Sequence, residues 1–263
     1  MEPRKLRVAV HKFASCDGCQ LAFLNAGEAL LALSERVDFV HFAELGPMDP
    51  EAEVDVAFIE GSVCTREERD RLQRIRAHSH FLISLGACAT AGGLQALRNL
   101  ADGEAWLNEI YPRREYLDAL ATATPLSEEV TVDLAIWGCP VNGEQVFQVI
   151  AELERGLTPR LPDDPLCLEC KRRGAVCTLV TQGRPCLGPV TRGGCGALCP
   201  RFGRDCYGCF GPSEHPNTEA LGRRFEGLGL IDAAIARRFL FINSAAPAFR
   251  EAGLRWGGRP ACP

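Results

Sequence analysis

Fourteen cysteines in 263 residues are the feature that most restricts how this chain can fold. A disulfide scaffold explains such a number in short secreted proteins that carry a signal peptide. Here the first residues have no apolar signal region and no Arg-Arg pair, and they lead directly into a strand-like segment. We therefore expect a cytoplasmic protein, in which thiols at this density bind metal more often than they form disulfides.

Residues 1–157 alternate short apolar runs with amphipathic segments. This alternation predicts an α/β domain of the flavodoxin-like type, with a doubly wound parallel sheet. Thr65 is a suitable N-cap for one helix, and Glu68 would complete a capping box. The expected buried strands are Leu6–Phe13, Val54–Ile59, Phe81–Leu85 and Val132–Trp137, and the expected helices are Gln20–Leu33, Thr65–His78 and Gly143–Glu154.

The composition changes after this domain, and residues 158–263 form the predicted second domain. Gly, Pro, Cys and Arg dominate between Pro159 and Pro216, where little apolar material is available for a core. Metal ligation is the expected source of order in this small irregular region. Helical patterning returns from Thr218 to Phe241.

Four cysteines of the first domain follow predicted strands. Cys16 and Cys19 come after the first strand, Cys88 after the third and Cys139 after the fourth. Ligands of open parallel sheets bind beyond the carboxyl ends of the strands, so these thiols should converge. Four thiolates are the number that a cubane cluster requires. Two alternatives stay open: buried core cysteines, and a redox pair formed by the C-x2-C, which leaves Cys88 and Cys139 unexplained.

Two further residues lie at the end of the second predicted strand. Glu60 could bind the metal or support its ligands from behind, and Cys64 could do the same. We favour a free or supporting role for Cys64 over direct ligation. Of the remaining residues that can bind metal, Cys262 is expected to have no specific role. The five histidines are expected to cap helix ends or to lie on the surface.

Eight more cysteines lie between residues 167 and 209. Their spacing divides them into two groups of four: Cys167, Cys170, Cys177 and Cys186, then Cys195, Cys199, Cys206 and Cys209. Eight thiolates suit two [4Fe–4S] clusters, although two structural zinc sites remain possible on spacing alone. The same segment has seven basic residues (Lys171, Arg172, Arg173, Arg184, Arg192, Arg201, Arg204) and two acidic ones (Glu169, Asp205). Such cations would stabilise an anionic cluster, or simply form a solvated basic face.

The motifs Cys16-Asp-Gly-Cys19, Glu60-Gly-Ser62, Gly86-Ala-Cys88 and Gly138-Cys139-Pro140 resemble those of the small subunit of nickel–iron hydrogenases. They are also similar to the cluster-bearing subunit of respiratory complex I. The second cysteine set, with Cys167-Leu-Glu-Cys170 and Cys206-Tyr-Gly-Cys209, distinguishes the two, because only the hydrogenase subunits have such a region.

This resemblance implies three [4Fe–4S] clusters and an electron-transfer role. Many relatives have proline at the position of Cys199 and a three-iron cluster there, so the cysteine implies a four-iron one. The implied ligands are Cys16, Cys19, Cys88 and Cys139 for the proximal cluster, Cys195, Cys199, Cys206 and Cys209 for the medial one, and Cys167, Cys170, Cys177 and Cys186 for the distal one.

The implied partners are a large subunit that holds the nickel–iron centre, and flavin-containing NAD(P) diaphorase and ferredoxin-like subunits. The chain looks most like the small subunit of cytoplasmic, NAD(P)-linked sulfhydrogenases. It has no nucleotide-binding fingerprint, so NAD(P) should bind elsewhere. The net charge of −5 gives no indication of nucleic acid, and no apolar run is long enough to span a membrane. The alternatives are a stand-alone iron–sulfur carrier, a deazaflavin-linked or ferredoxin-linked hydrogenase subunit, and a zinc-stabilised interaction module.

Overall fold

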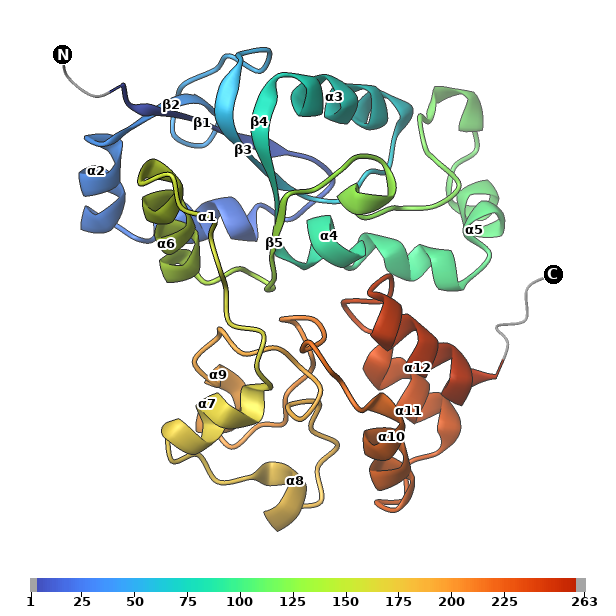
Figure 1. Ribbon diagram of the computed structural model, residues 1–263. Helices are drawn as coiled ribbons and strands as arrows, with labels where there is room; N and C mark the ends of the chain where they lie inside the picture. Colours follow the sequence, from blue (N-terminus) through green and yellow to red (C-terminus); the bar gives the residue numbers. More distant parts are fainter. Residues whose placement is uncertain (1–3, 259–263) are drawn as a thin grey trace.

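A five-stranded parallel sheet forms the first part of the molecule in the computed structural model, which describes residues 4–258 (Figure 1). Its strand order, β2-β1-β3-β4-β5, is the flavodoxin-like order with a switch point between β1 and β3. The predicted fold class is therefore confirmed. The strands are β1 (Leu6–Lys12), β2 (Val37–Phe42), β3 (Val54–Glu60), β4 (Ser79–Leu85) and β5 (Leu134–Ile136).

Helices cover both faces of this sheet, as a doubly wound fold requires. One face is covered by α1 (Gly18–Leu24), α2 (Glu28–Ser34) and α6 (Gly143–Glu154), which bury Phe23, Val146 and Ile150. The other packs against α3 (Arg66–Ala77), which buries Leu72 and Ile75. The remaining short elements are α4 (Gly86–Ala91), η1 (Gln95–Leu100), α5 (Gly103–Ile110), η2 (Arg114–Tyr116) and η3 (Leu126–Glu128).

The structure corrects the sequence prediction in three places. The helix predicted over residues 20–33 is two helices, because Gly27 adopts a positive φ of 55° between α1 and α2. Strand β2 was not predicted, although Val37 and Phe39 alternate with exposed Asp38 as in a half-buried strand. Strand β5 is shorter than the predicted run. By contrast, the capping box of Thr65 and Glu68 is confirmed.

Two histidines are not where the sequence predicted them. The rings of His11 and His41 are buried and stacked, with centroids 4.6 Å apart, so the expectation of surface or helix-end positions is wrong for both. It is right for His78, which follows α3 as its C-cap, and for the exposed His80 and His215. Cys262 lies outside the described residues.

The second part of the chain contains only short helices until residue 217. Leu187, Phe225, Phe239 and Phe249 belong to a core there, to which the last three helices contribute six of the fourteen buried residues. The predicted return of helices after Thr218 is confirmed, and α12 extends it further. The helices are α7 (Leu166–Arg172), α8 (Thr178–Thr181), α9 (Leu198–Arg201), α10 (Thr218–Glu226), α11 (Asp232–Phe239) and α12 (Pro247–Gly257).

The second part packs against the loops that follow β4 and β5 (Figure 1). The Asn142 amide donates a hydrogen bond to the carbonyl of Gly194, with an N–O distance of 2.8 Å. Trp137 covers Gly211 so closely that a Cβ at this glycine would overlap the indole ring. These contacts place the cysteine-rich segment beside the carboxyl edge of the sheet. The boundary between residues 157 and 158 stays a prediction. Within residues 4–258, no helix combines the length and the hydropathy needed to cross a membrane.

Candidate metal centres

The four cysteines of the first set meet at the carboxyl edge of the sheet. Cys16 and Cys139 are exposed, Cys88 is half-buried and Cys19 is buried. The backbone geometry brings them together: a Cβ at Gly86 would meet both the Sγ of Cys19 and the carbonyl of Gly138, and a Cβ at Gly18 would meet both the Sγ of Cys16 and the Cβ of Pro140. Burial, and then the neighbouring thiolates of Cys139 and Cys16, raise the pKa of Cys88 to about 11. Burial and Glu60 together raise the pKa of Cys19 still further. Such thiols stay protonated at neutral pH unless a cation takes the place of the proton.

Glycines bring the backbone close to these thiols. Gly86 has a φ of 85°, and a Cβ there would overlap the Sγ of Cys19. Gly93, with a φ of 59°, has the same relation to the Sγ of Cys88. A side chain at either position would displace a thiol, so both glycines are needed for the backbone conformation and for the space around the sulfurs.

Glu60 lies at the centre of this edge because β3 runs between β1 and β4. It is only 2% exposed, and its carboxylate accepts the backbone N–H groups of Cys19 (3.0 Å) and Gln20 (3.2 Å). Burial raises the pKa of Glu60, and these two hydrogen bonds oppose the rise. The carboxylate therefore holds the first turn of α1, and with it Cys19. This is the position expected of a residue that supports ligands.

Cys64 has different neighbours from the first set. Its thiol lies 3.5 Å from the hydroxyl of Ser62, and burial raises its pKa. The charged groups that act on this thiol are Arg98 and Glu68, and none of the four cysteines is among them. This placement agrees with a cysteine that does not bind the metal, which stays a prediction.

Cys167, Cys170, Cys177 and Cys186 line one cavity of about 100 Å³, together with Lys171, Val176 and Pro200. A Cβ at Gly188 would lie 3.4 Å from the Sγ of Cys186 and 3.6 Å from that of Cys167, so these two sulfurs face a common point. Burial, and then the neighbouring thiolates, raise the pKa values of Cys167 and Cys170 to about 11. The structure therefore brings this predicted group together.

The last group connects the other two. Burial, followed by Cys195, Cys139 and Cys199, raises the pKa of Cys209 to about 12. Cys139 belongs to the first set, so Cys209 lies on the side of the sheet edge. Toward the group that lines the cavity, the N–H of Cys206 donates to the Sγ of Cys186 over 3.2 Å. Cys195 is also among the thiolates that raise the pKa of Cys170. The group of Cys195, Cys199, Cys206 and Cys209 thus lies between the other two.

The thiol groups offer features that an iron–sulfur cluster uses at its ligands. A cubane takes four thiolates and accepts backbone N–H groups at sulfur. Such donors are present: Gly208 donates to Cys206 over 3.3 Å, and Val141 donates to Cys19.

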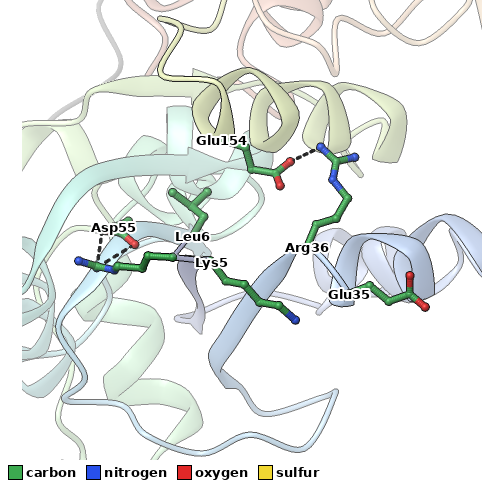
Figure 2. Close-up of a pocket in the computed structure, with 7 residues that line it drawn as sticks. Lys5, Leu6, Glu35, Arg36, Asp55 and Glu154 are labelled. Atoms are coloured by element: carbon green, nitrogen blue, oxygen red, sulfur yellow. Dashed lines mark hydrogen bonds and ion pairs between the residues drawn. The ribbon is translucent and has the colours of Figure 1, made fainter. Parts of the chain in front are cut away.

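A surface hollow of about 740 Å³ lies at the opposite edge of the sheet, where the strands begin (Figure 2). Arg4 pairs with Asp55, and Arg36 pairs with Glu154, so its charges are largely compensated. Its lining contains no cysteine. The hollow is therefore separate from the candidate metal centres.

Comparison with known proteins gives a family. The model of the 20 kDa subunit of NADH:ubiquinone oxidoreductase matches residues 16–153, which hold the whole first cysteine set. The chain belongs to this family. Within it, the relatives are hydrogenase subunits, which confirms the hydrogenase resemblance. The delta subunit of sulfhydrogenase 2 from Pyrococcus furiosus is 36% identical, over 89% of this chain and 97% of its own length.

Two further relatives show how far the likeness extends. One subunit of the F420-non-reducing hydrogenase from Methanothermobacter marburgensis is 30% identical, over 80% of this chain and 79% of its own length. A solved structure of an NAD⁺-reducing nickel–iron hydrogenase has a TM-score of 0.55 and 33% identity, over 60% of this chain and 96% of that chain. The match to the sulfhydrogenase subunit covers 89% of this chain, whereas residues 1–157 make up only about 60% of its 263 residues. The likeness to the sulfhydrogenase subunit therefore extends into the cysteine-rich part.

Proposed function

We propose that this chain is the electron-transfer subunit of a nickel–iron hydrogenase and that it works with a large subunit where H₂ is split. The observation that carries the proposal is the row of three cysteine groups, linked by the Cys139–Cys209 and Cys186–Cys206 neighbours. Four-iron clusters, when bound there, would supply one-electron transfer between the partner's metal site and an electron acceptor. No catalytic acid, base or nucleophile is needed in this chain.

Each group would have its own place along this row. Cys16 and Cys139 are exposed at the sheet edge, where a large subunit would cover them. They would hold the proximal cluster with Cys19 and Cys88. The middle group, Cys195, Cys199, Cys206 and Cys209, would hold the medial cluster. The group Cys167, Cys170, Cys177 and Cys186 would hold the distal one, where the exposed Cys177 faces solvent.

The chain's own residues would set the properties of these sites. Backbone N–H groups that point at Cys19, Cys186 and Cys206 would stabilise the thiolates and raise the reduction potential. Glu60 would keep Cys19 in position. The apolar core around Cys186 and Cys206 would exclude water from the middle of the row.

The acceptor completes the proposal. An NAD(P) diaphorase module with flavin and ferredoxin-like subunits, in the cytoplasm, is the acceptor that the likeness to the NAD⁺-reducing nickel–iron hydrogenase favours. A ferredoxin or a deazaflavin is the alternative. The two exposed thiols at the sheet edge argue against a stand-alone carrier, because they would leave a cluster open to solvent.

Anaerobic purification with metal and mass analysis tests this function. We expect about twelve irons and twelve sulfides per chain and a stoichiometric partner that contains nickel. Cys139→Ser should lose about four irons, while the matched variant Cys64→Ser should keep them all. A colourless monomer with two or three zinc ions would overturn the proposal. Rates of H₂-dependent reduction of NAD(P)⁺, coenzyme F420 and ferredoxin would identify the acceptor.

A further inference from the structure

The cavity of Cys167, Cys170, Cys177 and Cys186 lies in a segment, residues 167–209, whose exposed charged side chains are basic. Between residues 167 and 209 the two acidic side chains are both engaged inside the fold. Glu169 accepts the N–H groups of Gly194 (2.6 Å) and Ala197 (3.1 Å). Asp205 is 6% exposed and pairs with Arg238 over 2.7 Å. Neither carboxylate is therefore free to neutralise the surface.

Six of the seven basic side chains of the same segment are exposed, and the seventh, Arg192, is half-buried. Within the described part of the chain, none of them forms an ion pair: Lys171, Arg172, Arg173, Arg184, Arg201 and Arg204. Lys171 lines the cavity directly, and Arg201 follows Pro200 in its wall. Arg184 donates to the carbonyl of Gly203, two residues after Arg201, over 2.8 Å. This concentration of positive charge contrasts with the net charge of −5 for the whole chain.

Exposed apolar side chains accompany these charges. Val176 lies in the cavity wall and is 64% exposed. Val180, four residues further on in α8, is 75% exposed, and Phe202 is 75% exposed, two residues after Pro200. An apolar centre with a charged rim is the usual form of a protein–protein interface, and transient electron-transfer complexes use small interfaces of this kind. We call the surface formed by Lys171, Val176, Val180, Arg184, Arg201, Phe202 and Arg204 the basic docking surface.

We propose that the basic docking surface binds the acidic face of a redox protein, which exchanges electrons with the group at Cys167–Cys186. The inference rests on the proposed function and adds the chemistry of the partner to it. Opposite charges would steer the encounter and raise its rate at low salt. The exposed thiol of Cys177 lies within this surface, so the docked partner would come close to the distal site. An anionic membrane is the competing occupant, and binding to anionic vesicles distinguishes it from an acidic protein.

The test uses the hydrogenase complex, washed in high salt, with two protein acceptors of opposite charge. One H₂ gives two protons and two electrons, which reduce two molecules of a one-electron acceptor. We expect an acidic plant-type ferredoxin to have a KM at least tenfold below that of a basic cytochrome c, and this KM should rise steeply with salt. In Arg201→Glu/Arg204→Glu, the ratio of ferredoxin-dependent to viologen-dependent rate should fall about tenfold.

The matched control is Arg224→Glu/Arg250→Glu, which reverses two exposed charges on α10 and α12. It should leave the ratio unchanged. An unaltered ratio in the first variant, or a preference for cytochrome c, would overturn the docking proposal. Loss of co-sedimentation with phosphatidylglycerol vesicles in that variant would instead assign the surface to a membrane.

If the wild-type complex reduced no viologen with H₂, the proposed function would fail. Calorimetric binding of ferredoxin to the complex and to both variants would still decide the docking proposal.

Discussion

The two parts of this molecule hold their cysteines by different physical means. In the sheet part, an apolar core on both faces of five strands fixes the strand ends, and the first set follows these ends directly: Cys16 and Cys139 lie in loops, and Cys19 and Cys88 lie at the starts of α1 and α4. In the part around residues 166–210, helices are short, and Cys186 and Cys206 belong to the core with Cys170 and Cys195 packed against it, whereas Cys19 is the one cysteine of the first set in the sheet core. Folding therefore creates the first site, whereas metal binding and folding should be one event in the second part.

Removal of iron should reveal the difference between the two parts most strongly. In protein prepared without iron, amides of residues 166–210 should lose at least 100-fold in protection from hydrogen exchange, because little else orders them. Amides of β3 and β4 should keep their protection, since apolar burial holds them. Mass spectrometry of peptides from both parts measures the difference, and iron and sulfide added back should reverse it. Equal loss in the two parts would refute the distinction.

Single ligand substitutions sharpen the same contrast. Cys88→Ser should lower H₂-dependent viologen reduction at least 100-fold, because it interrupts the row next to the large subunit, yet the exchange protection of residues 166–210 should persist. Cys186→Ser should lose that protection as well. Diaphorase activity of the complex with NAD(P)H should survive in Cys88→Ser. Cys64→Ser is the control, with a near wild-type rate. A rate near wild type in Cys88→Ser would contradict the placement of the first site.

The contrast also explains which features the sequence reveals. The β-α alternation is local, so four strands and the convergence of Cys16, Cys19, Cys88 and Cys139 follow from pattern alone. Strand β2 is harder to recognise, because Asp38 and His41 interrupt its apolar run at the edge of the sheet. In the second part, spacing divides eight cysteines into two groups. It does not order them, because the neighbours Cys139 and Cys209 are brought together only by tertiary packing.

Acid should lower the free energy of unfolding of the sheet part through His11, which is not one of the proposed metal ligands. Burial, and then His41 and Arg71, lower the pKa of His11 to about 3 from an ordinary value of 6.5. The neutral ring is therefore favoured in the folded state. Its contribution is present above pH 6.5 and is lost progressively as the pH falls toward 3. Between pH 7.5 and pH 5 the loss is about 2 kcal/mol.

Urea unfolding of the β1–β3 region, followed by hydrogen exchange at each pH, measures this loss. His11→Asn should flatten the pH dependence, whereas His80→Asn, at an exposed position, should leave it unchanged. If the free energy of unfolding changed with pH equally in His11→Asn and in the wild type, another group would be responsible.

The smallest effect tests whether the sheet part is stabilised by ordinary local interactions. The Thr65 hydroxyl accepts the N–H of Glu68, and the Glu68 carboxylate accepts the N–H groups of Thr65 and Cys64. Thr65→Ala should cost about 1 kcal/mol of unfolding free energy, and Thr65→Ser should restore most of it. Because α3 lies on the face opposite α1 and α6, iron content should stay constant in both variants. A loss of iron in Thr65→Ala would mean that a change at one helix end reaches the metal sites, so that the sheet part would depend on metal in the same way as the second part.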